Sequence, residues 1–393
     1  MARIGIFGGS FNPPHLGHIL AVREFQQKLA LDLVLMIPAS IPPHKQLSSN
    51  SPDAQTRLQL THLAVQDLEN VQVLDIELKR EGASYTADTL AELRKQYPSD
   101  ELFLLMGTDM FFSFEKWYCP EKITGIATLA VAHRNVDNPK ALHECANRLE
   151  EKFSAKICLI ENDYLPHSST SVRALLTFDC GERYLAPQVM QYIRDNRLYY
   201  VGEELNNLSF ECLSAISLSL HKANRVNHVI GCSETAVELA RIYGEDENSA
   251  RCAGILHDIT KALNEEEQLH LCEKYGIILN QLERENPKLL HAKTGATIAR
   301  EIFGQSDAVC RAIYWHTTGR ENMSMLEKII YLADYIEPNR DFSTVEDLRR
   351  LTYENIDEAL LMGLRMSIEQ LTKRGMEIDP NSLAALHSLE ARK

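Results

Sequence analysis

Several features are missing from this 393-residue sequence, and each absence excludes a class of protein. No apolar run approaches the roughly 20 residues that a membrane-spanning helix needs. The apolar start is interrupted by Gly8-Gly9 and has no basic segment of the kind that opens a signal peptide. The nine cysteines include no C-x-x-C pair, which argues against a disulfide framework or a structural zinc site. Reduced thiols favour the cytoplasm, and we expect a cytoplasmic protein that does not contact a membrane.

Positive charge is also scarce. The formal net charge is −14, and neither half of the chain is basic. A strongly basic surface is what holds nucleic acid by its phosphates, so we do not expect a nucleic-acid partner. Small anionic nucleotides can still bind through local groups, namely helix N-termini, a few Lys and Arg side chains, or metal ions.

The first half alternates short apolar runs with helical patterns. Residues 3–7, 32–37, 71–77, 102–106, 126–132 and 156–160 read as strands, and residues 18–30, 57–68 and 86–96 read as helices. Strands that alternate with helices indicate a parallel sheet with helices on both faces. The fold class predicted for this half is therefore a doubly wound α/β sheet.

The pattern changes near Tyr200. Residues 202–207 are polar and mark the expected junction. Beyond them helical periods dominate, at 236–243, 250–256, 265–275, 294–303, 307–315, 325–336 and 353–372, with no convincing strand. We therefore predict two domains, an α/β domain over residues 1–201 and an all-α domain over residues 208–393.

A glycine-rich segment, G-G-S-F-N-P-P-H-L-G-H, runs from Gly8 to His18 where the first strand leads into the first helix. Glycines there let backbone N–H groups approach a phosphate, and the helix N-terminus adds partial positive charge. His15 and His18 are three residues apart, so both lie on one side of the first helical turn. The segment is neither a Walker A motif nor a G-x-G-x-x-G fingerprint.

A second segment, S-S-T-S-V-R, runs from Ser168 to Arg173 after the last predicted strand. Ser or Thr before an apolar helical period is an N-cap signal, and on its own this segment would be read as capping. Together with the first segment, its hydroxyls, free N–H groups and single Arg indicate an anion-binding site.

These two segments resemble the nucleotidyltransferases with H-x-G-H and S-S-T-x-x-R motifs, and nicotinate-nucleotide adenylyltransferase is the closer resemblance. It covers about residues 1–201 and is supported by Arg57 and the segments Pro42–Lys45, Ser84–Thr86 and Tyr192–Tyr199. Asn12 and His167 depart from the family pattern, where Asp and Ile are frequent. The resemblance implies a Rossmann-like fold and direct attack of the nicotinate mononucleotide phosphate on the α-phosphorus of ATP·Mg²⁺.

The resemblance also implies roles for individual residues. His15 and His18 are expected at the α- and β-phosphates, and Ser169, Thr170 and Arg173 at the β/γ end. Lys45 is a candidate for reaching the phosphates, and Asp109 for contacting either the ribose or a Mg²⁺-linked water. Trp117 is expected to stack on the pyridine nucleotide, with a core aromatic as the alternative reading. The remaining expected nucleotide-binding residues are Gly8, Gly9, Ser10, Phe11, Ser84, Tyr85, Thr86, Gly107 and Arg134.

In the second half, imidazoles and carboxylates recur in the order H…HD…H…H…D. The six candidate metal ligands are His228, His257, Asp258, His291, His316 and Asp334. Such donors suit Fe, Mn, Co, Zn or Ni, and a His-Asp doublet can bridge two metals through its carboxylate. Apolar neighbours indicate burial, which is costly for carboxylates unless they are paired or bind metal.

This order resembles the HD superfamily of phosphohydrolases, and the landmarks Arg225, Lys261 and Arg340 resemble its YqeK group. The resemblance implies symmetrical hydrolysis of diadenosine tetraphosphate to two ADP by two divalent metals, with Fe implied and Mn or Co permitted. His228, His257, Asp258 and Asp334 would hold one metal, and Asp258, His291 and His316 the other. Lys261, Arg225 and Arg340 are candidate phosphate-binding residues, with a solvated surface charge as the alternative for each.

Three readings stay open at this point. The chain is a bifunctional enzyme, or an adenylyltransferase whose HD domain acts on another nucleotide or senses one, or an enzyme that transfers to phosphopantetheine or uses a cytidylyl substrate. Pro42–Lys45 and Tyr192–Tyr199 argue against the last reading. The sequence leaves the oligomeric state open, a homo-oligomer included.

Overall fold

A computed structural model describes residues 1–43, 47, 51–133, 139–161 and 167–391. The chain divides into two compact units, and each is described here by itself. The first comprises Met1–Leu176 with Gly181–Val201, and the second Thr177–Cys180 with Gly202–Lys393. Among the described residues, no helix is both long and apolar enough to cross a membrane.

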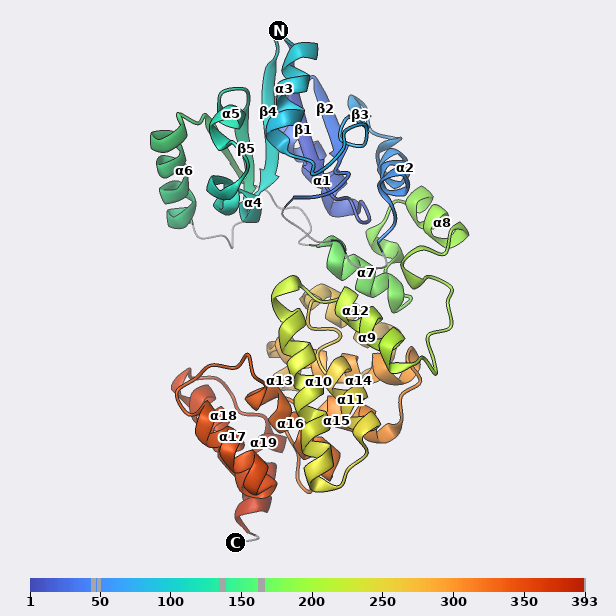
Figure 1. Cartoon of the computed structure of the whole chain (residues 1–393), viewed down its shortest axis with the longest axis vertical. Coiled ribbons are helices and arrows are strands. Elements are labelled where there is room, and N and C mark those ends of the chain that lie inside the picture. The colour runs from blue at the N-terminus through green and yellow to red at the C-terminus, as the bar shows by residue number, and fades with distance from the viewer. Residues whose placement is uncertain (44–46, 48–50, 134–138, 162–166, 392–393) are drawn as a thin grey trace. The chain divides into compact units, whose positions relative to one another are not determined.

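The first unit is built on one six-stranded sheet in which every neighbouring pair is parallel (Figure 1). The strand order is β3-β2-β1-β4-β5-β6. The strands are β1 (Arg3–Gly9), β2 (Leu33–Pro38), β3 (Val71–Val73), β4 (Glu101–Gly107), β5 (Thr128–His133) and β6 (Ile157–Glu161). The order reverses between β1 and β4, and in such sheets the crevice beyond the carboxyl ends of those strands is where ligands bind.

Both faces of the sheet are covered by helices, which explains why the middle of the longer strands is apolar. On one face, Ile6, Leu35, Leu104 and Val131 pack in a buried cluster with residues of the helices between β3 and β6. Side chains of the other face, such as Met36, are also buried. The helices of this unit are α1 (Leu16–Leu29), α2 (Ala54–Val65), α3 (Thr86–Gln96), α4 (Thr108–Ser113), α5 (Pro120–Thr124), α6 (Pro139–Phe153), α7 (Ser169–Thr177) and α8 (Pro187–Asp195).

The predicted strand at residues 71–77 is the main correction in this unit, because β3 ends at Val73. The N–H groups of Leu78 and Lys79 turn back to the carbonyl of Asp75 at 3.0 and 3.3 Å, so the chain leaves the sheet edge in a turn. Glu77 was expected on the strand, but it lies buried with its carboxylate 2.7 Å from the Thr89 hydroxyl.

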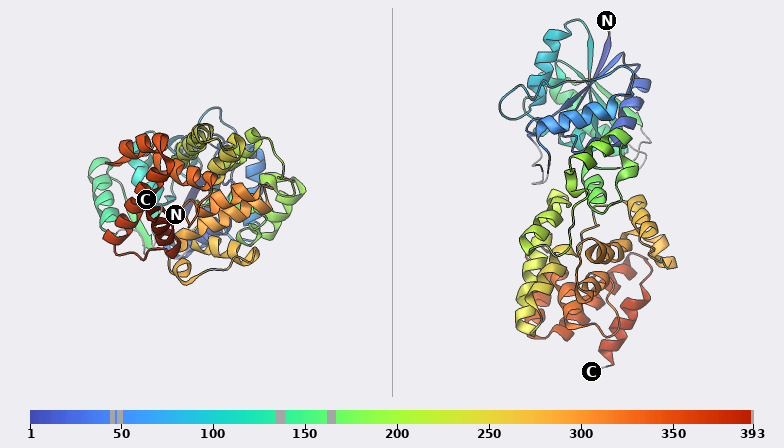
Figure 2. Two further views of the ribbon diagram at one scale, coloured as in Figure 1. Left: turned by 90° about the horizontal axis from the view of Figure 1, so that it is seen from below. Right: turned by 90° about the vertical axis from the view of Figure 1, so that its right-hand side faces the viewer.

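The second unit is all-helical over the described residues, which confirms the predicted fold class. Figure 2 shows the same elements in two further directions. The helices are α9 (Phe210–Ser219), α10 (Ala223–Tyr243), α11 (Glu247–Leu256), α12 (Glu265–Lys274), α13 (Gln281–Glu285), α14 (Leu290–Glu301), α15 (Asp307–Trp315), α16 (Met325–Ile336), α17 (Val345–Glu354), α18 (Ile356–Lys373) and α19 (Pro380–Glu390).

Two predicted helices of this unit have different bounds in the structure. The helix expected at 236–243 begins 13 residues earlier, as α10, because its first half carries polar side chains that point to a shared site instead of forming an apolar stripe. The helix expected at 353–372 is interrupted at Asn355. The Asn355 side chain accepts hydrogen bonds from the N–H groups of Asp357 and Glu358, and so caps the start of α18.

Candidate functional sites

The first candidate site forms where β1 leads into α1. Gly8 and Gly9 end the strand, and His15 occupies the N-cap position of α1. A Cβ atom on Gly8 would meet no atom within 4 Å, whereas one on Gly9 would lie 3.1 Å from the Phe11 ring. Gly107 ends β4, the neighbouring strand, so both glycine segments reach the same edge of the sheet. This edge lies at the reversal of strand order, where a nucleotide is expected.

The two histidines of the first motif stack against each other at the start of α1. Their ring centroids lie 3.8 Å apart. The His15 backbone N–H donates to Nδ1 of His18 at 3.2 Å, so the neutral His18 ring carries its proton on Nε2. His15 is buried and His18 is half-buried. In this tautomer the donor of the His18 ring is Nε2–H, the kind of group from which a phosphate oxygen accepts.

The structure brings the second motif onto the first, across about 160 residues of sequence. Ser169, the first residue of α7, donates its hydroxyl to the carbonyl of Pro13 at 3.1 Å. The Arg173 guanidinium donates to the carbonyl of Asn12 at 2.7 Å and to the Thr170 hydroxyl at 3.3 Å. The N-termini of α1 and α7 therefore meet at one loop, and both carry partial positive charge.

Arg173 is more deeply buried than a residue that only binds substrate would need to be. The residue is 4% exposed, and burial lowers the pKa of its guanidinium. Its hydrogen bonds to the loop make it part of the framework, and its role at the β/γ phosphates stays a prediction.

In the sequence Arg57 only supports the family resemblance, whereas in the structure it holds two loops by hydrogen bonds to their main chain. It is 1% exposed and donates to the carbonyls of Ser10 at 2.8 Å and Ser40 at 3.0 Å. Burial lowers the pKa of its guanidinium as well. An Arg on the buried face of α2, between Ala54 and Val65, was the signal that could have identified it.

The Ser10–Asn12 loop is thus held from two sides. Arg57 binds the carbonyl at one end and Arg173 the carbonyl at the other, while Phe11 between them has a φ of +42°. The Tyr199 hydroxyl donates to Oδ1 of Asn12 at 2.8 Å, and burial raises the pKa of Tyr199, which keeps the hydroxyl protonated. In the trans Ser10–Phe11 peptide the N–H points opposite to the carbonyl, so the inward Ser10 carbonyl turns the Phe11 N–H outward. The Asn12 carbonyl precedes Pro13, which has no N–H.

The other predicted nucleotide-binding residues lie on three further segments. Ser84 is buried, and its hydroxyl accepts from the Ser40 N–H at 3.0 Å. Tyr85 stacks with Tyr118 at a centroid distance of 4.5 Å. Thr86 begins α3, and Asp109 lies in the first turn of α4. Lys45 and Arg134 fall outside the described residues.

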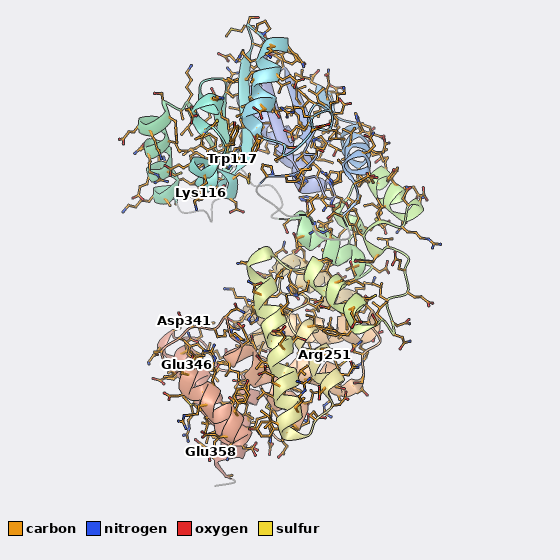
Figure 3. The ribbon with its side chains drawn as sticks, viewed as in Figure 1. Lys116, Trp117, Arg251, Asp341, Glu346 and Glu358 are labelled. Carbon is orange, nitrogen blue, oxygen red and sulfur yellow. The ribbon has the colours of Figure 1, made fainter. Side chains whose placement is uncertain are left out.

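Phe11 and Trp117 contribute packing as well as position. The Phe11 ring is 1% exposed and lies 5.1 Å from the His18 ring, so it belongs to the core beneath the motif. Trp117 follows Lys116 in the first unit (Figure 3) and is half-buried, with its ring 5.3 Å from Phe114. Trp117 packs on the core and keeps an accessible part, and its stacking on the pyridine nucleotide stays a prediction.

The second candidate site lies in the helical unit and gathers all six predicted ligands. His228 lies on α10, His291 on α14 and Asp334 on α16, while His257 and His316 occupy the C-cap positions of α11 and α15. His257, Asp258 and His316 are at most 1% exposed. Convergence from five helices explains why no single stretch of sequence contains the site.

The two oxygens of Asp258 face two different groups of ligands. Its Oδ2 lies 3.8 Å from Nε2 of His228 and 3.5 Å from Nε2 of His257. Its Oδ1 lies 3.3 Å from Nε2 of His291 and 3.6 Å from Nε2 of His316. Oδ1 of Asp334 completes the first group, at 3.2 Å from Nε2 of His228. Asp258 is thus placed between two donor clusters.

All four imidazoles present the same nitrogen to the carboxylates, because each uses its Nδ1–H elsewhere. Nδ1 donates to Gly254 O in His257 (2.8 Å), to Lys288 O in His291 (2.6 Å), to Ile313 O in His316 (2.6 Å) and to Glu337 Oε1 in His228 (3.0 Å). Each Nε2 is then the lone-pair nitrogen that a metal ligand requires. Glu337 is a further residue of the site, and it is not among the candidates taken from the sequence.

The donor set fits divalent metal ions. Bonds of about 2.0–2.2 Å place neighbouring donors of one metal roughly 3.0–3.5 Å apart, close to the distances above. The Nε2 atoms of His228 and His257 are buried and make no well-directed hydrogen bond within the described residues. Two ligand groups, His228-His257-Asp334 and His257-Asp258-His316, each offer atoms within 4.8 Å of one another. Both observations are expected of a metal site.

The site's electrostatics favour the metal-binding form of Asp258 and His291, whereas the pKa of His257 is raised well above its usual value, so that this ring would give up its proton when a metal binds. Burial by itself raises the pKa of Asp258, but the histidines that converge on it, His257 above all, hold it well below its usual range. Burial lowers the pKa of His291 to about 4, so this ring is neutral at physiological pH. An ionised carboxylate and a neutral imidazole are the forms that bind divalent metals.

Three cations surround the two carboxylates. Arg225 pairs with Oδ2 of Asp258, and Arg340 with Oδ1 of Asp334 at 2.5 Å. The Lys261 ammonium lies 2.9 Å from Nε2 of His291 and 3.8 Å from Oδ1 of Asp258. The side chains of all three stay about one-third exposed, so they can also face a phosphate that enters from solvent.

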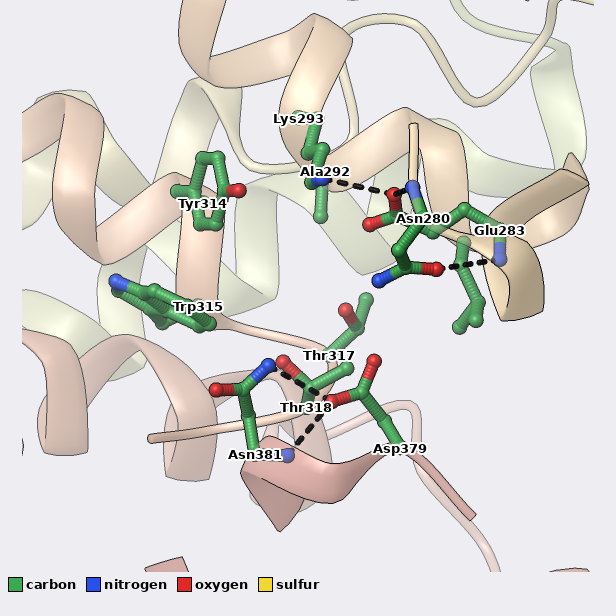
Figure 4. Close-up of a pocket in the computed structure, with 11 residues that line it drawn as sticks. Asn280, Glu283, Ala292, Lys293, Tyr314, Trp315, Thr317, Thr318, Asp379 and Asn381 are labelled. Atoms are coloured by element: carbon green, nitrogen blue, oxygen red, sulfur yellow. Dashed lines mark hydrogen bonds and ion pairs between the residues drawn. The ribbon is translucent and has the colours of Figure 1, made fainter. Parts of the chain in front are cut away.

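A small polar cavity lies among α13, α14, α15 and the start of α19 (Figure 4). Thr317 and Thr318, which follow His316, line it together with the Lys293–Glu283 ion pair. Its volume is about 50 Å³, far below the roughly 300 Å³ at which ligand pockets begin, so it is suited to water and not to a nucleotide.

Comparison with known proteins follows this division of the chain. A Cytidylyltransferase-like family model matches residues 6–175, and an HD domain model matches residues 225–339. A probable nicotinate-nucleotide adenylyltransferase of Shewanella pealeana is 38% identical over 210 residues, 50% of this chain and 95% of that protein. One of Borrelia garinii subsp. bavariensis is 35% identical over 198 residues, 50% of this chain and 94% of that protein. Through its N-terminal half, the chain belongs to the nicotinate-nucleotide adenylyltransferase family.

The C-terminal half carries an HD domain, and such a domain implies divalent-metal binding. This half is similar to a predicted HD superfamily hydrolase involved in NAD metabolism from Clostridium acetobutylicum. The two are 38% identical with a TM-score of 0.46, covering 47% of this chain and 99% of that one. The expected joining of a nicotinate-nucleotide adenylyltransferase to an HD domain is confirmed.

Proposed function

We propose that the first unit transfers the adenylyl group of ATP to nicotinate mononucleotide, giving deamido-NAD and pyrophosphate. The observation that carries this proposal is the meeting of the α1 and α7 N-termini at the Ser10–Asn12 loop. An oxygen of the mononucleotide phosphate attacks the α-phosphorus of ATP, and the bond to the β-phosphate oxygen breaks. No side-chain nucleophile is needed, so the protein supplies positioning and charge stabilisation.

The named residues divide this work. His18 donates its Nε2–H to the oxygen on which charge grows, and His15 supports that ring by stacking and through its backbone N–H. The outward Phe11 N–H and the N-terminus of α7 bind the polyphosphate, with Ser169 and Thr170 at the β/γ end. Mg²⁺ bound with ATP supplies further charge neutralisation. We assign Ser84, Tyr85, Thr86 and Trp117 to binding of the pyridine nucleotide.

Product analysis by mass spectrometry tests this proposal. The full chain is incubated with ATP, Mg²⁺ and nicotinate mononucleotide, and in parallel with nicotinamide mononucleotide, phosphopantetheine, or CTP in place of ATP. We expect deamido-NAD and pyrophosphate in equal amounts from the first mixture. Transfer to phosphopantetheine or use of CTP, with no dinucleotide formed, would contradict the assignment.

For the second unit we propose metal-dependent symmetrical hydrolysis of diadenosine tetraphosphate, in which one water and one substrate give two ADP. Four imidazole Nε2 atoms arranged about the two oxygens of Asp258 support two metal ions, one held by His228, His257, Asp258 and Asp334, the other by Asp258, His291 and His316. Metals so bound lower the pKa of a water and screen the tetraphosphate charge. We propose Fe as the native metal, with Mn or Co accepted.

The chain's own cations complete the proposal. Arg225, Lys261 and Arg340 are partly exposed beside the carboxylates, so they can bind the phosphates on either side of the cleaved bond. Symmetrical cleavage requires two phosphates on each side of that bond. Arg225 and Arg340 lie beside Oδ2 of Asp258 and beside Asp334, and Lys261 lies nearer Oδ1 of Asp258. Cations at both positions suit the binding of two phosphates on each side of the bond better than a single cluster would.

The test uses full-length protein freed of metal and reloaded with Fe²⁺, Mn²⁺ or Co²⁺, with diadenosine tetraphosphate as substrate. ADP as the sole product supports the proposal. ATP and AMP in equal amounts would show asymmetrical cleavage and overturn the positioning argument. Binding without hydrolysis for each metal would indicate a nucleotide-sensing domain instead.

A further inference from the structure

We propose that Glu337 is a positioning residue for the metal centre, acting through His228, and that Gly231 is needed to admit it. The inference rests on the proposed metal-dependent function of the second unit. It assigns roles to two residues outside the six ligands.

The Glu337 carboxylate is fully engaged by its surroundings. Glu337 follows the last residue of α16 and is 1% exposed. Its Oε1 accepts from Nδ1 of His228 at 3.0 Å, and its Oε2 accepts from the backbone and side-chain N–H groups of Asn339, both at 2.8 Å. Asn339 thereby fixes the orientation of the carboxylate, which in turn fixes the His228 ring.

Gly231 leaves the space that this carboxylate occupies. Gly231 lies within α10, one turn after His228. Glycine destabilises the interior of a helix, so its presence there indicates a steric requirement. A Cβ atom at this position would lie 2.6 Å from Oε2 of Glu337 and 3.3 Å from the Asn339 side-chain nitrogen. Any other residue would push the carboxylate away from His228.

His228 differs from the other three imidazoles in this partner. The Nδ1–H groups of His257, His291 and His316 are bonded to neutral backbone carbonyls, whereas that of His228 is bonded to a carboxylate. A carboxylate partner makes an imidazole a stronger electron donor and fixes its tautomer. We therefore assign Glu337 to strengthening the metal group formed by His228, His257, Asp258 and Asp334, and not the one formed by His291 and His316.

The experiment measures metal binding and not turnover. Full-length protein freed of metal is titrated with Co²⁺, and the visible absorption of the bound ion reports both affinity and ligand geometry. For Glu337→Gln we expect one of two binding steps to weaken by about 10- to 100-fold with a changed spectrum, and the other step to stay as in the wild type. Glu337→Asp should recover part of the loss.

Glu327→Gln is the matched control. Glu327 lies on α16 and is also a fully buried glutamate, but its carboxylate bonds to the Ser324 N–H and to Arg311 and Arg320 in place of a candidate metal ligand. Its Co²⁺ titration should equal that of the wild type. If Glu337→Gln does not fold, the same Co²⁺ titration is made on Gly231→Ala. Alanine favours the helix, so this variant should fold, and its Cβ displaces the Glu337 carboxylate.

The outcomes separate this inference from the proposed function. A wild-type protein that takes up no Co²⁺ would defeat the metal-dependent function itself. Two wild-type steps, together with unchanged affinities and spectra in folded Glu337→Gln or Gly231→Ala, would overturn the role of Glu337 alone.

Discussion

Replacing Arg57 by Met tests whether a buried guanidinium shapes the phosphate loop. The change leaves the carbonyls of Ser10 and Ser40 without their donors at 2.8 and 3.0 Å. A buried acceptor left unsatisfied costs about 1–3 kcal/mol, so two cost about 2–6 kcal/mol. Met also removes a charge that burial disfavours, as its lowered pKa indicates, so we expect the lower half of that range, about 2–4 kcal/mol.

Arg57→Lys gives an intermediate case. The planar guanidinium reaches both carbonyls with two nitrogens, whereas one ammonium on a flexible stem is expected to reach only one of them. We expect a loss of about 1–3 kcal/mol in the free energy of unfolding for this variant.

Catalysis should suffer more than stability. If the Ser10 carbonyl turns outward, the adjoining N–H turns away from the phosphate site. A displacement of about 1 Å in such a group is enough for a roughly 100-fold loss in kcat/KM. The assay is adenylyl transfer to nicotinate mononucleotide, with denaturant unfolding followed by Trp117 fluorescence in a Trp315→Phe background, since the chain has two tryptophans.

Arg94→Met is the control. Arg94 also donates to main-chain carbonyls, those of Tyr97, Asp100 and Ile126 at 2.8–2.9 Å, but before β4 and after α5, far in sequence from the motif loops. It should lower stability and leave kcat/KM nearly unchanged. The reasoning fails if Arg57→Met keeps both the wild-type unfolding midpoint and the wild-type kcat/KM.

The other predictions concern both units. His18→Ala should remove most adenylyl transfer while circular dichroism stays unchanged; near-normal kcat would refute its role. Asp258→Ala should abolish ADP release and raise cellular diadenosine tetraphosphate, without affecting deamido-NAD formation. Burial lowers the pKa of His221 to about 4 from 6.5, so its neutral form is favoured on folding. The stability it contributes is present above pH 6.5 and is lost as pH falls toward 4, by at most about 3 kcal/mol. His221→Leu should flatten that part of the stability profile, and an unchanged profile would contradict it.

The sequence predicted those parts of the sites that lie within a short stretch. His15 and His18 could be predicted from the sequence because a strand, glycines and a helix start follow one another within 16 residues. The candidate metal ligands of the helical unit could be predicted because imidazole and carboxylate side chains are rare in apolar surroundings. In both cases the residue type and its local neighbours carry the information.

Residues that act through contacts with parts of the chain far away in sequence were not predictable in this way. Arg57 reaches Ser10 across 47 positions and Glu337 reaches His228 across 109, and neither belongs to a periodic pattern. The start of α10 was missed because its first turns hold Arg225 and His228 in place of an apolar stripe. The break at Asn355 was missed because an Asn cap has the same sequence appearance as a polar position within a helix.

The fixed Nδ1 bonds of the four histidines bear on the order in which this unit forms and takes up its ions. Three backbone carbonyls and one carboxylate fix the orientation of the imidazole rings. The guanidinium groups of Arg225 and Arg340 and the Lys261 ammonium compensate the negative charge of Asp258 and Asp334. We therefore expect this unit to fold without an ion, in contrast to small zinc domains that are unfolded without one. Chelation should leave a folded unit that regains its ions on their return, so the enzyme can exchange one divalent metal for another as supply in the cell changes.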